Sequence, residues 1–187
     1  ALGGGLEFAL TSAAKIGIVK EFPETRSFML GHAGKAGILP ETISYIAFSR
    51  SRDDILREVK ISFNRDFAES LISNLRFKDF SKDYFMRTVV PSSWTDSDEA
   101  ALFSEKKQDG LMESLVNFLD ANAPKSLVIV DSLTDLVVSD TVKFEDVVSL
   151  MKGIQRMAKK WGSVFYVVLT DGILDNRRQQ MIIDSVD

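Results

Sequence analysis

The chain has 187 residues, of which 45% are hydrophobic, so it is long enough to bury one ordinary core and fits a single domain. It has no cysteine and one histidine, which excludes a disulfide scaffold and a zinc site built on thiolates or paired imidazoles. The net charge of −4 gives no general attraction to phosphate backbones and no apolar run is long enough to cross a bilayer, so we expect a cytoplasmic protein whose partners are neither membranes nor nucleic acid.

The first part of the chain predicts one helix, one long connection and one strand. Small and apolar residues recur at helical spacing between Leu6 and Gly17, which predicts a helix. The stretch 20–40 is longer than a usual link from a helix to a strand, and we expect a flexible loop or an insertion there. Its glycine-rich run 31–37 fits no phosphate-binding spacing, so a surface loop is favoured over an anion site. The apolar run 43–48 predicts a buried strand.

The middle of the chain predicts three helices and a weaker strand. Apolar residues share one helical face over 55–63 and again over 67–75. The run 86–90 predicts a strand, which the following proline ends. The polar stretch 92–108 is the second candidate flexible loop or insertion, and an apolar stripe over 111–119 predicts the third helix.

The last third of the chain indicates the fold class. Two runs of β-branched and aromatic residues, 126–131 and 163–170, predict strands whose near-continuous apolarity requires cover on both faces. Helical spacing over 144–161 predicts the longest helix, which Gly162 ends, and 182–187 resembles the opening of another strand. Because helices and strands alternate, the sequence predicts an α/β fold with a mainly parallel sheet flanked by helices on both faces. We expect one domain over 1–187 that is trimmed at both ends.

One predicted strand ends in a motif with a chemical meaning. The run Ser126–Asp131 delivers an aspartate to the carboxyl end of its strand, where a parallel sheet opens its ligand crevice and an acid can hold Mg²⁺. Many buried strands end in aspartate for turn or capping reasons, so this motif alone is a weak signal. Together with the segment Ser132–Asp135 that follows it, the motif resembles the Walker B segment of the RecA, RadA and KaiC ATPases.

The resemblance to the RecA and KaiC ATPases extends over most of the chain in order. The segment 45–56 resembles their second strand and the helix start after it, and 7–14 resembles the helix after their phosphate-binding loop. The segment 144–170 resembles their next helix and strand. The resemblance implies a RecA-like fold, a sensor position at Thr170, and Mg²⁺ held at Asp131 wherever Mg-ATP binds.

The departures from this pattern decide the functional prediction. A working phosphate-binding loop reads Gly-x-x-x-x-Gly-Lys-Ser/Thr, because its backbone N–H groups and lysine hold the phosphates and its hydroxyl ligates Mg²⁺. In the matching place this chain has Gly3, Gly4, Gly5, Leu6 and Glu7. The resemblance thus puts Leu6 at the lysine position and Glu7 at the hydroxyl position, where a negative charge beside phosphates costs about 1–4 kcal/mol. The water-activating glutamate of these ATPases falls at Ser49 or Arg50, neither of which is a general base near neutral pH.

The sequence therefore predicts a catalytically degenerate RecA- or KaiC-like protein that needs no cofactor. We expect it to act as a regulatory or scaffold subunit through self-association or contact with a RecA- or KaiC-like paralogue. The alternative is an ATPase that binds Mg-ATP with the metal near Asp131. The candidate interface residues are Arg50, Arg52, Arg177 and Arg178. Solvated surface charge is the other interpretation of these arginines.

Overall fold

The architecture is a parallel sheet between two layers of helices. The computed structural model describes residues 3–31, 37, 39–95 and 110–186. Its strands are β1 (Thr42–Ala47), β2 (Leu75–Asp79), β3 (Ser126–Asp131) and β4 (Val164–Val167). They form one sheet in the order β2-β1-β3-β4, in which every neighbouring pair is parallel. The predicted α/β class and parallel sheet are confirmed for this part of the chain.

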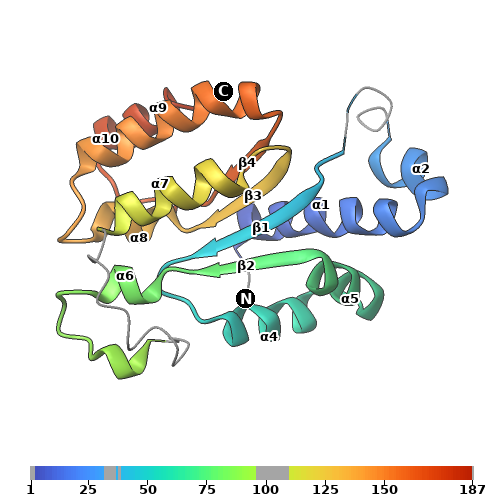
Figure 1. Ribbon diagram of the computed structural model, residues 1–187, viewed down its shortest axis with the longest axis horizontal. Coiled ribbons are helices and arrows are strands. Elements are labelled where there is room, and N and C mark those ends of the chain that lie inside the picture. The colour runs from blue at the N-terminus through green and yellow to red at the C-terminus, as the bar shows by residue number, and fades with distance from the viewer. Residues whose placement is uncertain (1–2, 32–36, 38, 96–109, 187) are drawn as a thin grey trace.

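Each face of the sheet has its own apolar core, because successive strand residues point to opposite faces. Tyr45 and Ile129 belong to the core under the helices α1 (Gly4–Glu21), α4 (Arg52–Ser62) and α5 (Arg65–Asn74). Ile46 and Val130 belong to the other core. That core is covered by α7 (Leu111–Asn122), α8 (Leu133–Val138), α9 (Phe144–Trp161) and α10 (Asn176–Ile183). Figure 1 shows α7, α9 and α10 above the sheet and α4 and α5 below it.

The strand order fixes the place where the connections diverge. From β1 the chain passes through α4 and α5 on one face to β2. From β3 the chain passes through α8 and α9 on the opposite face to β4, which lies on the far side of β3. The two connections therefore part between the carboxyl ends of β1 and β3. In open α/β sheets, ligands bind at this kind of switch point.

Short-range signals explain where several helices begin and end. Ser51 and Asn64 cap α4 and α5 by accepting hydrogen bonds from the backbone N–H groups of the third helical residues. Ser132 forms a capping box with Asp135 at the start of α8. Gly162 ends α9 in a left-handed conformation with φ 64°, as the sequence predicted.

Three local predictions were wrong. The strand predicted over 86–90 is absent, and Arg87 has a left-handed φ of 65° that interrupts extended backbone there. The strand that lies beside β1 is β2, whose first residue had been counted in the helical stripe 67–75. The strand expected over 182–187 is not formed by its described residues 182–186, because the first two of them end α10. The strand predicted over 163–170 is shorter than expected, at Val164–Val167.

The two long connections contain short helical segments. After α1 ends, the stretch 20–40 contains η1 (Pro23–Thr25) and α2 (Arg26–Leu30), while 32–36 and 38 lie outside the described residues. The stretch 92–108 begins with η2 (Ser92–Trp94), and 96–109 lie outside the described residues. The flexibility predicted for both stretches stays a prediction. None of the described helices is long and apolar enough to span a membrane.

Two glycines inside helices provide a matched test of this packing. A Cβ at Gly17 of α1 would lie 2.8 Å from the Ser70 Oγ and 3.3 Å from the Ser70 carbonyl oxygen of α5, whereas a Cβ at Gly153 of α9 meets nothing within 4 Å. We expect Gly17→Ala to lower the free energy of unfolding by about 1–3 kcal/mol, because α1 and α5 must move apart. Gly153→Ala should raise it by about 0.5–1 kcal/mol, because alanine favours the helix. Urea denaturation followed by circular dichroism measures both, and equal changes would contradict the close α1–α5 contact.

Candidate functional site

The switch point between β1 and β3 brings together residues that the sequence analysis had singled out separately. Ser49 and Arg50 follow β1, Asp131 ends β3, and Asp135 lies in the first turn of α8. β1 and β3 pair in register up to Ala47 and Asp131. The acids of one strand end therefore face the Ser-Arg pair of the other.

The Asp131 carboxylate contacts Tyr45 of β1 and Arg50, which follows β1. Its side chain is only 8% exposed, and the fully buried Tyr45 donates a hydrogen bond from its hydroxyl to Asp131 Oδ2 at 2.5 Å. Arg50 Nη1 lies 3.4 Å from the same carboxylate oxygen. Burial raises the pKa of Tyr45 far above its ordinary value, and the charge of Asp131 and its hydrogen bond raise that pKa further. Tyr45 is therefore a permanent donor to Asp131.

Arg50 connects Asp131 to a second carboxylate. Its Nη2 donates to Glu58 Oε2 of α4 at 2.7 Å, with both side chains about 30% exposed. The hydrogen bond from Arg50 lowers the pKa of Glu58 below its ordinary value. Burial alone would lower the pKa of Arg50, but the hydrogen bond to Glu58 and the charge of Asp131 outweigh it, so this pKa is raised. The guanidinium is thus a fixed positive charge between two carboxylates.

Ser49 and Asp135 form a second contact at the switch point, between the end of β1 and the start of α8. The Ser49 hydroxyl lies 3.1 Å from both carboxylate oxygens of Asp135, and Asp135 also accepts from the Ser132 backbone N–H in the capping box. Burial raises the pKa of Asp135, against the opposing effect of the hydrogen bonds from Ser49 and Ser132. Ser49 therefore serves as a hydrogen-bond donor that holds the β1 end to α8.

The residues that the resemblance assigns to the phosphate-binding loop lie at the start of α1. Gly3 caps α1 only through its carbonyl, which accepts from the Glu7 N–H at 2.9 Å, and the first residues of α1 are Gly4 and Gly5. Leu6 is buried in the core, whereas the Glu7 side chain is exposed. Within the described part of the chain, no hydrogen bond or ion pair joins these residues to the acid at the end of β3.

The first turn of α1 is placed against β4. Phe8 of α1 packs edge-to-face on Tyr166 of β4, with ring centroids 5.8 Å apart. Beyond β4, the Thr170 N–H donates to the Thr134 hydroxyl at 2.8 Å. The predicted sensor residue therefore connects the end of β4 to α8 and makes no described contact with Asp131.

The four candidate interface arginines do not form one patch. Arg50 faces the switch point, and Arg52 is exposed in the first turn of α4. Arg177 is exposed on α10, while Arg178 lies 3.8 Å from Asp175 and 5.3 Å from the centre of the Phe144 ring. Because α4 and α10 cover opposite faces of the sheet, Arg52 and the α10 pair cannot contact the same small ligand (Figure 1).

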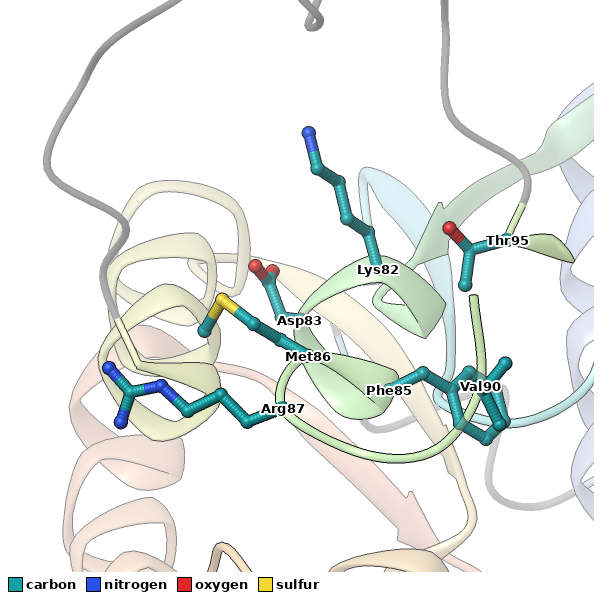
Figure 2. Close-up of a pocket in the computed structure, with 7 residues that line it drawn as sticks. All are labelled: Lys82, Asp83, Phe85, Met86, Arg87, Val90 and Thr95. Carbon is teal, nitrogen blue, oxygen red and sulfur yellow. The ribbon is translucent and has the colours of Figure 1, made fainter. Parts of the chain in front are cut away.

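Two hollows lie near the carboxyl edge of the sheet. The first has a volume of about 480 Å³, and its walls include Arg50, Arg57, Glu58 and Ile61. The second, of about 330 Å³, lies by α6 (Ser81–Phe85), and none of the predicted site residues lines it. Figure 2 shows its two cations, Lys82 and Arg87, with Asp83 and Met86 between them. The hollow beside Arg50 is the one that adjoins the switch point.

Sequence reasoning missed two residues of this site. Tyr45 was counted only as part of a buried strand, and its partnership with Asp131 depends on the pairing of β1 with β3. Glu58 was not singled out as a site residue, although it accepts a hydrogen bond from Arg50 across the start of α4. The available signal was a cation just before a predicted helix and an acid about two turns into it.

Comparisons with protein-family models, with curated proteins and with solved structures gave no match to this chain. In the described ranges, no group of three histidine, cysteine, aspartate or glutamate side chains is arranged to hold a metal ion. The contacts of Asp131 and Arg50 at the switch point are therefore the basis of the proposed function.

The Arg50 bridge gives a stability prediction with an internal control. We expect Arg50→Met to lower the free energy of unfolding by about 1–3 kcal/mol, because it leaves the buried Asp131 carboxylate without its cation. Arg57→Met removes a partner 3.3 Å from Asp54 in a pair whose side chains are both more than half exposed, so it should change stability by less than about 0.5 kcal/mol. Urea denaturation compares the two, and equal losses would show that Asp131 does not depend on Arg50.

The lowered pKa of Glu58 gives a pH prediction. A carboxyl group whose pKa is lower in the folded state stabilises the fold above its unfolded pKa, near the ordinary value of 4.5, and loses this effect as the pH falls through the folded value. The stability difference between wild type and Glu58→Gln should therefore be largest at pH 6–7 and shrink below pH 4.5. Because Arg50 causes the shift, the same comparison in an Arg50→Met background should show a much smaller pH dependence. Urea melts across this pH range measure both differences.

Proposed function

We propose that this chain is a non-catalytic α/β module of the RecA and KaiC type that acts as a regulatory or scaffold subunit through contacts with other proteins. The observation that carries the proposal is the bonding of Asp131. The acid that would hold Mg²⁺ in an active ATPase of this type accepts a hydrogen bond from Tyr45 and faces the Arg50 guanidinium at 3.4 Å.

Electrostatics explain why this arrangement disfavours a metal ion. Two unit charges 4 Å apart interact by about 4 kcal/mol near a protein surface, and the repulsion doubles when one of them is a divalent cation. Mg²⁺ at Asp131 would meet this repulsion from Arg50 unless the guanidinium moved. Moving it would break the 2.7 Å hydrogen bond to Glu58. Arg50 thus supplies internally the positive charge that a metal would bring.

Independent positions support the same proposal. Leu6, which the resemblance puts in the place of the phosphate-binding lysine, is buried in the apolar core. Ser49 and Arg50, at the position of the water-activating glutamate, both donate hydrogen bonds to carboxylates. Leu6 cannot neutralise a phosphate as the lysine of an active ATPase does, and neither Ser49 nor Arg50 can activate water as its glutamate does.

The alternative, an ATPase that holds Mg-ATP near Asp131, has one observation in its favour. Asp131 and Asp135 lie at the topological switch point, where α/β proteins bind their ligands. In that case Arg50 would swing away from Asp131 when the nucleotide enters. The two functions therefore differ in whether Mg-ATP stabilises the folded chain.

A melting experiment separates them. A ligand present at a hundred times its Kd for the folded state stabilises that state by about 2.7 kcal/mol. In a chain of this size this raises the melting temperature by about 5–10 °C. We expect millimolar Mg-ATP to leave the melting temperature of the wild-type protein unchanged within about 1 °C. A rise of several degrees that Asp131→Asn abolishes would instead establish Mg-ATP binding at Asp131 and contradict the proposed function.

A variant tests whether Arg50 is the cause. In Arg50→Gln the Asp131 carboxylate has no neighbouring cation, so millimolar Mg²⁺ or Mn²⁺ alone should raise its melting temperature. The double variant Arg50→Gln with Asp131→Asn is the matched control and should not respond. If neither variant responds to metal, the absence of binding in the wild type has a cause other than Arg50.

A further inference from the structure

The two edges of the sheet are built differently. β2, at one edge, carries the charged residues Arg76, Lys78 and Asp79 among its five residues. Charged side chains on an edge strand oppose pairing with another chain. β4, at the other edge, is Val-Phe-Tyr-Val, and no charged residue occurs anywhere from 163 to 170. Within the described residues no strand pairs with the outer side of β4. Of the two edge strands, only β4 carries no charged residue.

Apolar surface lies on both faces of this open edge. On one face a hollow of about 470 Å³ runs between β4 and α9, and its walls include Met151, Ile154 and Phe165. None of the residues that line it is charged, in a chain of which 27% is charged. On the other face Phe8 is 63% exposed where it packs on Tyr166. The edge therefore offers unpaired backbone groups together with uncharged surface.

We propose that β4 of a second copy of this chain pairs antiparallel with β4, across a twofold axis perpendicular to the sheet, and joins two sheets into one. An antiparallel strand edge is complementary to itself, because it presents both N–H donors and carbonyl acceptors. The uncharged lining brings no like charges together when two copies meet. A perpendicular axis keeps equivalent faces on the same side, so Phe165 and Val167 of each copy lie beside the hollow of the other.

This inference deepens the proposed interaction function and rests on it for its biological meaning. The dimer itself depends only on the β4 edge, which is distinct from the Arg50 bridge at the switch point. Nucleotide binding and dimerisation can therefore be measured separately on the same protein.

The test is the oligomeric state of matched variants. Light scattering coupled to size-exclusion chromatography should show a dimer that dissociates on dilution from tens of micromolar. Val164 is 47% exposed at the start of β4, so Val164→Lys should be accommodated in the monomer and block pairing, which leaves a monomer at every concentration. Val89 is fully exposed after α6, and Val89→Lys is the matched control that should still dimerise.

Hydrogen exchange gives a second measurement that needs no variant. The backbone amides of 164–167 should exchange more slowly at high than at low protein concentration, and those of β2 should not change. A wild-type monomer at all concentrations, a dimer that survives Val164→Lys, or concentration-independent exchange at β4 would overturn the proposal, as would a different protein found paired with this edge. If Val164→Lys does not fold, the exchange experiment decides. If the protein is a monomer that does not bind Mg-ATP, the dimer proposal fails and the proposed function stands. If the protein is a dimer that binds Mg-ATP, the proposed function fails and the dimer proposal stands.

Discussion

The Arg50 guanidinium between Asp131 and Glu58 is the interaction on which the character of the site depends. It connects the residues after β1 to the last residue of β3 and to α4, at the switch point of the sheet. A buried carboxylate such as Asp131 is costly unless a positive charge or hydrogen-bond donors satisfy it. In this chain Tyr45 and Arg50 meet that need from within the protein, so the acid can persist without a metal. The aspartate at the strand end is therefore explained by the contacts of the folded chain, with no need for a bound metal.

Under the proposed function, the charge of Asp131 connects the departures from the ATPase pattern. If an ancestral site lost its phosphate-binding lysine, the acid at the end of β3 would keep a negative charge with no nucleotide-bound metal to balance it. A cation at position 50 resolves this imbalance, and Glu58 in turn orders that cation. Ser49 and Asp135 then join the remaining strand and helix ends with hydrogen bonds. The substitutions thus form one consistent arrangement, which favours a retained structural role over gradual decay.

The sequence predicted the general architecture well because its signals were local. Continuous apolar runs at 43–48 and 126–131 have cover on both faces and became the central strands β1 and β3. The sequence did not predict β2, because Leu75 fits a helical stripe as well as it fits the alternation with Phe77 that is typical of an edge strand. The apolar pair at 182–183 has the same ambiguity, and it forms the end of α10. Asp131, Ser49 and Arg50 could be placed at one sheet edge, but the hydrogen bond from Tyr45 to Asp131 depends on the register between β1 and β3, which no spacing along the chain encodes.

The two edges of the sheet, β2 and β4, differ in charge. Under the proposed function the chain gains nothing from nucleotide binding, so selection retains its fold only through the use of its surfaces, because most substitutions destabilise a protein. The β2 edge carries charges that keep other strands away, whereas the β4 edge carries none from 163 to 170. An uncharged strand edge is an aggregation risk in a monomer, and the second copy proposed above would cover it. The two proposals are therefore compatible, because Arg50 occupies the place of a metal at the switch point while the β4 edge stays available for contact between chains.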